Sequence, residues 1–279
     1  MAAGFFLFSA VDTQAKFLTQ TLHPIQIVWT RQLGLLIGVL FLLRLRGLAV
    51  LRTSTPFLQM SRGALAASSA TLFIVAVSFV PLADAVAISF VAPFFVTMLG
   101  ALILREPVGI RRWSAITVGF VGTLIVIRPG LGVIHPAALL LLLAALLFAL
   151  RQILSRMLSG GDRTETTVAY TALTGSLLLT IPLPFFWQWP QSWLELALLC
   201  GIGTLAAAGE FLIIRALEVG QAVVVAPMQY SMMIWGTFYG YIVFGQFPDF
   251  WTWIGAAIIV ASGIYTFYRE RKVMKLSGA

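Results

Sequence analysis

Charged residues are scarce in this sequence: they make up 10% of its 279 residues, while 60% are hydrophobic. An ordinary soluble domain carries about 25% charged residues, because its surface faces water. So few charges exclude a soluble globular domain and favour a protein whose surface faces lipid.

Groups that do chemistry are equally scarce. The single cysteine, Cys200, excludes an internal disulfide and a cysteine metal cluster. His23 and His135 each precede a proline and lack cysteine or acidic neighbours, so we expect no metal site. There is no glycine-rich phosphate loop through which ATP could drive the chain, and no Ser-His-Asp arrangement. We therefore expect no enzyme, no catalytic residue and no bound cofactor.

Long apolar runs are abundant. Each has about 17 to 24 residues, enough for a helix to cross a hydrocarbon core of roughly 30 Å. They lie at 2–18, 25–43, 62–80, 84–104, 111–128, 137–157, 168–187, 192–215, 222–244 and 250–268. These runs predict an all-α polytopic membrane protein with ten transmembrane helices. The first run leads into further runs, so we expect it to be a retained helix and not a cleaved signal peptide.

The net charge of +8 lies mostly in the connections between runs. One set of connections, with the C-terminal tail, holds Arg44, Arg46, Arg52, Arg62, Arg105, Arg111, Arg112, Arg156, Arg163, Arg215, Arg269, Arg271, Lys272 and Lys275. The opposite set holds Lys16 and Arg128. The positive-inside rule then predicts a bacterial inner-membrane protein with both termini in the cytoplasm, and no nucleic-acid partner.

The two halves of the chain are weak copies of each other. Aligning Glu106 with Gln246 also aligns Trp113 with Trp253, and the same offset aligns Lys16 with Arg156 and Asp12 with Gln152. Because each copy holds an odd number of spans, the second copy starts on the opposite side of the membrane. The sequence therefore predicts two inverted five-helix repeats, an architecture of secondary transporters.

Several stretches carry a more specific resemblance. The first half holds Pro81–Pro93, Leu104–Gly109, Gly119–Gly122 and Ile127–Gly130; the second holds Ile214–Glu218, Val225–Pro227, Phe244–Asp249 and Gly255–Gly263. These stretches resemble the paired EamA-type domains of the drug/metabolite transporter superfamily. The resemblance implies one repeat over 1–131, a second over 132–268 and a basic cytoplasmic tail at 269–279. It also implies movement of small metabolites through a cavity between the first, third, fourth, sixth, eighth and ninth spans. The acid usual in the second repeat is Gln246 here.

Charged residues within the spans are candidate site residues, because burying a charge in a bilayer costs about 2.5–3.5 kcal/mol. Asp12 and Lys16 share one helix face. They either neutralise each other, or Asp12 couples to protons while Lys16 faces substrate. Arg31 needs a partner, either Asp12 or a backbone carbonyl, or an anionic substrate group.

The second half raises the same questions. Arg151 and Gln152 lie in the sixth span, and we favour an Arg151 that snorkels to the inner surface. Glu210 lies on an alanine-rich span, either paired with Arg62 or Arg215 or acting as a second proton-coupling group. Pairing with Arg215 on the same helix is poor, because the two point about 140° apart.

Prolines interrupt the fourth and ninth spans at Pro93 and Pro227. Freed carbonyls at such breaks are tolerated where they face protein or a wet cavity. Cavity candidates near the breaks are Ser89, Phe90, Gln229, Tyr230 and Trp235, with Tyr170 on the seventh span. Most phenylalanines must simply pack, but polar-tipped aromatics favour a ring-containing or amphipathic solute.

These features predict a secondary transporter that moves a small organic metabolite by alternating access, with proton coupling through Asp12 or Glu210. The resemblance to the drug/metabolite transporter superfamily further implies a riboflavin-like vitamin or an amino-acid metabolite as the solute. The alternative is a membrane scaffold or sensor without transport; a channel is disfavoured by the lack of polar rings along any span. Gly34–Gly38 and Gly236–Gly240 indicate tight helix crossings inside one chain, or the seam of a homodimer.

Overall fold

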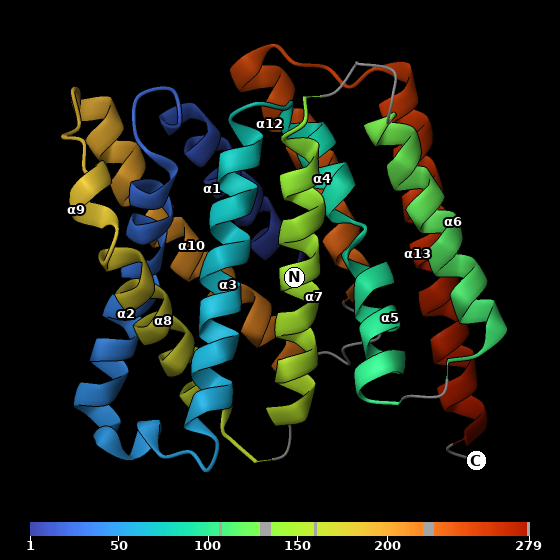
Figure 1. Ribbon diagram of the computed structural model, residues 1–279, viewed down its shortest axis with the longest axis horizontal. Helices are drawn as coiled ribbons and strands as arrows, with labels where there is room; N and C mark the ends of the chain where they lie inside the picture. The colour runs from blue at the N-terminus through green and yellow to red at the C-terminus, as the bar shows by residue number, and fades with distance from the viewer. Residues whose placement is uncertain (106–107, 129–134, 159–160, 220–225, 278–279) are drawn as a thin grey trace.

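The computed structural model describes residues 1–105, 108–128, 135–158, 161–219 and 226–277, and all regular structure within these ranges is helical. The helices are α1 (Ala2–Leu18), α2 (Pro24–Arg46), η1 (Leu48–Leu51), α3 (Pro56–Val77), α4 (Leu82–Ser89), α5 (Ala92–Ile103), α6 (Ile110–Ile127), α7 (Ala138–Leu158), α8 (Thr164–Thr180), α9 (Leu183–Phe186), α10 (Trp193–Val219), η2 (Ala226–Tyr230), α12 (Ser231–Phe244) and α13 (Phe250–Ser277). They form one bundle (Figure 1).

Local sequence sets where these helices begin and end. Pro24 occupies the first turn of α2, where its missing N–H costs nothing, and the His23 ring caps the helix by accepting a hydrogen bond from the Ile25 N–H. Gly47 ends α2 and Gly245 ends α12, both with positive φ. That conformation stops a helix and suits glycine, which has no Cβ.

The predicted interruption of the fourth span is present. α4 ends at Ser89 and α5 begins at Ala92, with Pro93 in its first turn. In the ninth predicted span the 3₁₀ helix η2, which contains Pro227, precedes α12. These breaks place short, non-α-helical backbone inside the bundle, close to Phe90 and Tyr230.

Five helical segments are long and apolar enough to cross a membrane: Pro24–Arg46, Pro56–Val77, Leu82–Ile103, Ala138–Leu158 and Trp193–Ile213. Trp113–Ile127 and Phe250–Thr266 are shorter apolar helices. Large apolar side chains such as Phe41, Phe57 and Trp193 are exposed on the outside of the bundle. Lipid can cover such a surface, so the chain is a polytopic α-helical membrane protein.

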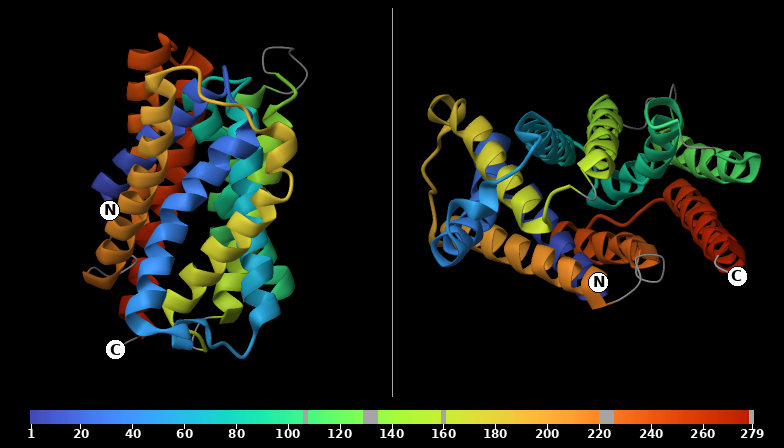
Figure 2. Two further views of the ribbon diagram at one scale, coloured as in Figure 1. Left: turned by 90° about the vertical axis from the view of Figure 1, so that its left-hand side faces the viewer. Right: turned by 90° about the horizontal axis from the view of Figure 1, so that it is seen from below.

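Viewed along the bundle, the helices form two layers (Figure 2, right). One layer contains α1, α2, α10, α12 and α13, and the other contains α8, α3, α7, α5 and α6. Each layer mixes helices from both halves of the sequence. The hairpin loops after α1, α3 and α12 lie at the upper end of Figure 1, and the basic loops after α2 and α7 lie at the lower end.

Glycines set the closest helix crossings. A Cβ on Gly34 would lie 2.0 Å from the Gly203 carbonyl oxygen, where α2 crosses α10. Gly122 and Gly255 meet in the same way where α6 packs against α13. Gly236 and Gly240 contact α4, whereas Gly38 faces open space. Three of the four glycines in the two predicted motifs therefore mark crossings within one chain.

Some predicted boundaries were wrong. α3 begins at Pro56 and not near residue 62, so Arg62 lies well inside a helix and not in a loop. The seventh predicted span, 168–187, corresponds to α8, which already ends at Thr180 because Pro182 and Pro184 follow. Glu106 and the predicted repeat boundary at 131/132 lie outside the described residues, as do the last two residues of the predicted tail.

Candidate functional site

Asp12 and Arg31 face each other between α1 and α2. Asp12 is buried, and its Oδ1 lies 3.8 Å from an Arg31 guanidinium nitrogen, while the guanidinium also lies 5.5 Å from the centre of the Phe8 ring. Of the partners considered for Asp12, the structure selects Arg31 and not Lys16. Each of these two residues is therefore the ionic partner of the other, and both belong to the first half of the sequence.

Arg62 and Arg151 lie side by side at the contact of α3 with α7. Arg62 Nε donates to Ser155 Oγ at 2.7 Å, and its Nη1 donates to Thr171 Oγ1 on α8. Ser155 in turn donates to the Arg151 carbonyl oxygen at 2.8 Å, one turn back along α7. Arg62 therefore reaches the helix face that carries Arg151.

Arg151 points away from the lower end of the bundle. Its guanidinium carbon lies 4.6 Å from the centre of the Phe148 ring, which is one turn nearer the upper end. Its Nε is buried and has no hydrogen-bond partner among the described residues. The snorkelling interpretation of Arg151 was therefore wrong, because the side chain folds back over the preceding turn, as helix geometry favours.

Glu210 completes this group from α10. Its carboxylate attracts both Arg62 and Arg151, and Arg151 is also repelled by Arg31. The predicted partner on another helix, Arg62, is thus in range; the side chain of Arg215, the other candidate, lies outside the described residues. We call Asp12, Arg31, Arg62, Arg151 and Glu210 the interior charge cluster.

The interior charge cluster lies between the two layers and near mid-depth. Asp12, Arg31 and Glu210 belong to one layer, and Arg62 and Arg151 to the other. At 1.5 Å per residue, Arg31 lies about 10 Å from the upper end of α2, and Arg151 about 10 Å from the lower end of α7. Arg62 was missed as a site residue because its predicted position was a basic loop.

The aromatic candidates gather at the breaks. Phe90 stacks on Tyr230 with ring centres 5.0 Å apart, and Tyr230 is hydrogen-bonded to Gln229. Tyr230 fits against Gly263, where a Cβ would lie 1.7 Å from its hydroxyl. Trp235 meets Phe6 edge to face at 5.0 Å, and its Nε1 is buried without a partner in the described part of the chain.

Other candidates lie elsewhere or are already bonded. The Tyr170 hydroxyl donates to the Leu51 carbonyl oxygen near the lower end, and the Ser89 hydroxyl donates within its own helix to Ala85. Gln152 is half-buried on α7 beside Arg151, and Pro93 is half-buried at the start of α5. Pro227 lies in η2, but its side chain is outside the description.

Lys16 lies at the upper end and joins the two halves of the sequence. Its ammonium donates to the Val80 carbonyl oxygen and, at 3.1 Å, to Gln246 Oε1. It also lies 5.3 Å from the centre of the Phe244 ring. These groups, with Thr19 and Gln20, line a hollow of about 270 Å³. We call the Lys16–Gln246 contact the upper tie.

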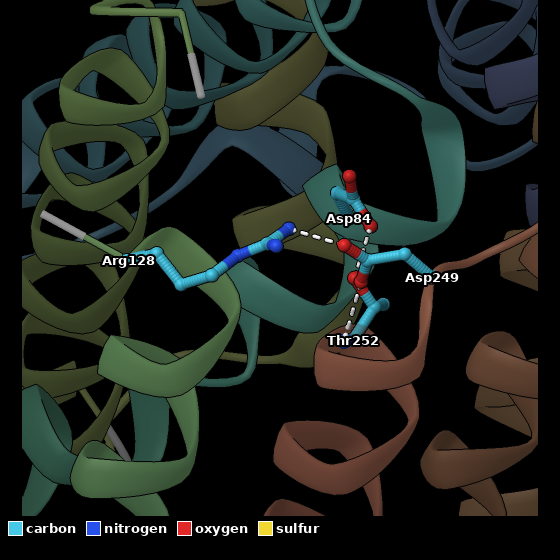
Figure 3. Close-up of polar contacts among 4 residues, drawn as sticks. All are labelled: Asp84, Arg128, Asp249 and Thr252. Carbon is cyan, nitrogen blue, oxygen red and sulfur yellow. Dashed lines mark hydrogen bonds and ion pairs between the residues drawn. The ribbon is translucent and has the colours of Figure 1, made fainter. Parts of the chain in front are cut away.

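A second polar group at the upper end joins α4, α6 and α13 (Figure 3). Arg128 lies 2.6 Å from an Asp249 carboxylate oxygen, and Thr252 donates from its backbone N–H to Asp249 and from its hydroxyl to Asp84. Desolvation raises the pKa of Asp249, but the Thr252 N–H and Arg128 outweigh it and hold that pKa below its usual range. Sequence reasoning missed Asp84, which reads as part of an apolar run.

The lower end is held by different helices. Arg46 pairs with Glu165, and the Asp162 carboxylate accepts from Thr53 at 2.6 Å and from Gln59 at 2.7 Å. Among the described residues there is no group of three or more His, Cys, Asp or Glu that could hold a metal ion. The polar contacts described so far therefore lie at the two ends of the bundle and in the interior charge cluster.

Comparison with known proteins supports the helical fold described above. A solved crystal structure shares the fold, with a TM-score of 0.62 at 17% identity over 97% of this chain and 98% of that one. An S-adenosylmethionine uptake transporter of Rickettsia bellii is 30% identical over 97% of this chain and 94% of its own length.

Two further relatives carry other names. A riboflavin transporter of Vibrio cholerae is 34% identical over 69% of this chain and 65% of its own length. A pseudopaline exporter of Pseudomonas aeruginosa is 28% identical over 93% and 91%. The model of the EamA-like transporter family matches residues 1–128 and 135–268. The two matched ranges contain all five residues of the interior charge cluster. The chain belongs to the EamA-like transporter family, whose members are membrane transporters of small molecules and not enzymes.

Proposed function

We propose that this protein is a secondary transporter that moves a small organic metabolite across a bacterial inner membrane by alternating access. In this proposal its ten spans form two inverted five-helix halves, and the basic lower end, where the C-terminus lies, faces the cytoplasm, with the N-terminus assigned to the same side of the membrane. The observation that carries the proposal is the interior charge cluster. Charges near mid-depth are costly in a bilayer and are retained where they bind a solute or a coupling ion.

The positions of aligned residues support the inversion. Lys16 lies in the last turn of α1 near the upper end, and its counterpart Arg156 lies in the last turn of α7 near the lower end. A simple duplication without inversion would put both at the same end. Inverted halves can exchange conformations, which opens the site to one side and then the other.

Alternating access also requires contacts that can break. At the upper end the two halves are joined by the upper tie, which lines a hollow, and by the contacts of Arg128 with Asp249 and of Thr252 with Asp84. At the lower end α3 is packed closely on α8, where a Cβ on Gly63 would lie 2.9 Å from Thr174 Cβ. In this proposal, the upper tie and the Arg128–Asp249 and Thr252–Asp84 contacts break when the site opens toward the upper end of the bundle.

The aromatic stack at the helix breaks indicates the substrate class, and the carboxylates of the interior charge cluster indicate the coupling groups. The stacked Phe90 and Tyr230 favour a ring-containing or amphipathic solute, and S-adenosylmethionine and riboflavin, the solutes named for relatives, both contain ring systems. Asp12 and Glu210 are the candidate proton-coupling groups because both are carboxylates of the cluster.

The test is counterflow in proteoliposomes with labelled S-adenosylmethionine and labelled riboflavin, each with and without a pH gradient. We expect exchange of at least one solute, accelerated by the gradient in the wild type and not in Asp12→Asn or Glu210→Gln. Glu165→Gln, which removes a carboxylate at the lower surface, should keep the response.

Absence of counterflow for both solutes, and for a wider set of vitamins and amino acids, would favour the scaffold or sensor alternative. Exchange in which both variants still respond to the gradient would keep transport and refute the assignment of the coupling groups.

A further inference from the structure

The interior charge cluster does not neutralise itself. Asp12 is matched by Arg31, but Arg62 and Arg151 share only Glu210, and no carboxylate lies within 4.0 Å of either guanidinium among the described residues. Arginine stays protonated at any relevant pH. The cluster therefore carries one positive charge in excess.

The donors of these two arginines are only partly used. Arg62 gives two of its N–H groups to hydroxyls of Ser155 and Thr171, which are neutral acceptors. Arg151 Nε is buried with no acceptor in the described part of the chain, and its guanidinium carbon lies 4.6 Å from the centre of the Phe148 ring. A buried donor without a partner is unfavourable, and more so when it is charged, so a missing acceptor is expected here.

The two arginines are also neighbours of like charge. The bond from Arg62 to Ser155, and from Ser155 to the Arg151 carbonyl, places both on one face of α7. Two adjacent cations in a medium of low dielectric repel each other, and an anion between them removes that repulsion. Arginine presents N–H groups in a planar fork that matches a carboxylate.

We propose that Arg62 and Arg151 bind a carboxylate of the transported solute, which rests on the function proposed above. The excess of one charge fits a monoanion. A dianion such as a phosphate monoester is disfavoured, because its two negative charges would lie close to the negative carboxylate of Glu210. Phe148, whose ring contacts Arg151, packs in the same apolar cluster as Val91, the neighbour of Phe90 in sequence. In this proposal the stacked rings of Phe90 and Tyr230 contact the rest of the solute.

The test compares acids with analogues that lack the carboxylate. The probes are S-adenosylmethionine and tryptophan, each against its decarboxylated analogue, with riboflavin as a neutral ring system; binding is measured by calorimetry and thermal shift on the detergent-purified protein. We expect an acid to bind at least tenfold more tightly than its decarboxylated analogue. Arg151→Gln and Arg62→Gln should each weaken binding of that acid by about 10-fold to 100-fold, since a charged hydrogen bond is lost, and leave the analogue unchanged.

Matched variants separate binding from folding. Arg163→Gln removes an exposed arginine at the start of α8 and should change the affinity of neither the acid nor its analogue. Arg151→Lys keeps the charge without the fork and should restore part of the affinity for the acid. Glu210→Gln raises the excess positive charge, so it should strengthen acid binding.

Several outcomes would overturn the proposal: equal affinity for acid and analogue, equal loss of both in Arg151→Gln, or no binding of either acid. Binding or counterflow of riboflavin alone would overturn carboxylate recognition while leaving the transport function intact. Failure of the transport function itself would appear as no counterflow of any solute.

Discussion

The upper tie offers a direct test of alternating access through Gln246→Glu. Gln246 Oε1 accepts from Lys16 at 3.1 Å, and Lys16 is only 8% exposed. The substitution keeps the shape of the side chain and turns a charge–amide contact into an ion pair. Because Lys16 is already buried, only the half-buried carboxylate loses hydration, so the usual penalty of burying both ions is halved.

The expected gain follows from the strengths of the two contacts. The present hydrogen bond already has a charged donor, so the gain comes from the attraction of the added carboxylate, about 4 kcal/mol for two charges 4 Å apart near a protein surface. Loss of hydration of that carboxylate offsets part of this attraction and leaves a gain of about 1–2 kcal/mol here. Such a difference shifts an equilibrium by a factor of roughly 5–30. If the upper tie must break in each cycle, Gln246→Glu should lower the turnover of counterflow by a factor in that range and raise the thermal unfolding midpoint.

Two variants control for charge and for shape. Gln20→Glu adds the same charge to the lining of the same hollow at an exposed position, where water screens it, and it should leave turnover unchanged. Gln246→Ala removes the acceptor and should lower the unfolding midpoint without slowing transport. Unchanged or faster turnover in a folded Gln246→Glu protein would refute the role of this contact as a gate.

Three further predictions concern packing, pH and charge. Gly34→Ala should destabilise the bundle by about 1–3 kcal/mol, because its Cβ would strike the Gly203 carbonyl, whereas Gly38→Ala meets no atom within 4 Å and should be neutral or stabilising in thermal unfolding. Burial lowers the pKa of His23 from 6.5, so the folded state binds a proton more weakly than the unfolded state; stability should be fully present above pH 6.5 and fall as the pH drops below it, and His23→Asn should flatten that dependence in unfolding midpoints measured from pH 8 to 5. Gln152→Asp should place a carboxylate beside Arg151 and weaken binding of S-adenosylmethionine relative to its decarboxylated analogue, measured by calorimetry, while a rise in its affinity would contradict the charge balance.

Much of the architecture could be predicted from the sequence, because hydropathy and helix-breaking residues act locally. Pro24, Gly47, Pro93 and Gly245 each mark a helix end or a break in the structure. The basic loops gather at one end of the bundle, as the alternation of charged connections predicts. The close crossing at Gly34 was also visible as a pattern of small residues.

The partners of the interior charges could not be predicted in the same way. Asp12 and Lys16 lie four residues apart, which predicts a contact on one helix, but Lys16 reaches the Val80 carbonyl and Gln246 while Asp12 meets Arg31. The choice depends on which neighbouring helix lies closest, and that is a property of the packed bundle. Arg62 was hidden for a similar reason: α3 begins six residues earlier than its apolar run, at a proline that favours the first turn.

The difference between the two halves of the sequence explains why the interior charge cluster carries one excess positive charge. The offset that aligns Asp12 with Gln152 also aligns Arg31 with Thr171, so the ion pair of the first half corresponds to a pair of neutral residues in the second. Arg62 reaches into that neutral position and donates to Thr171. The first half thus holds two interior arginines, Arg31 and Arg62, for the single carboxylate of Asp12, whereas the second half holds Arg151 and Glu210. A symmetric pair of halves would carry an even number of unmatched cations, whereas this chain holds one, and in the proposal the carboxylate of the solute supplies the missing negative charge.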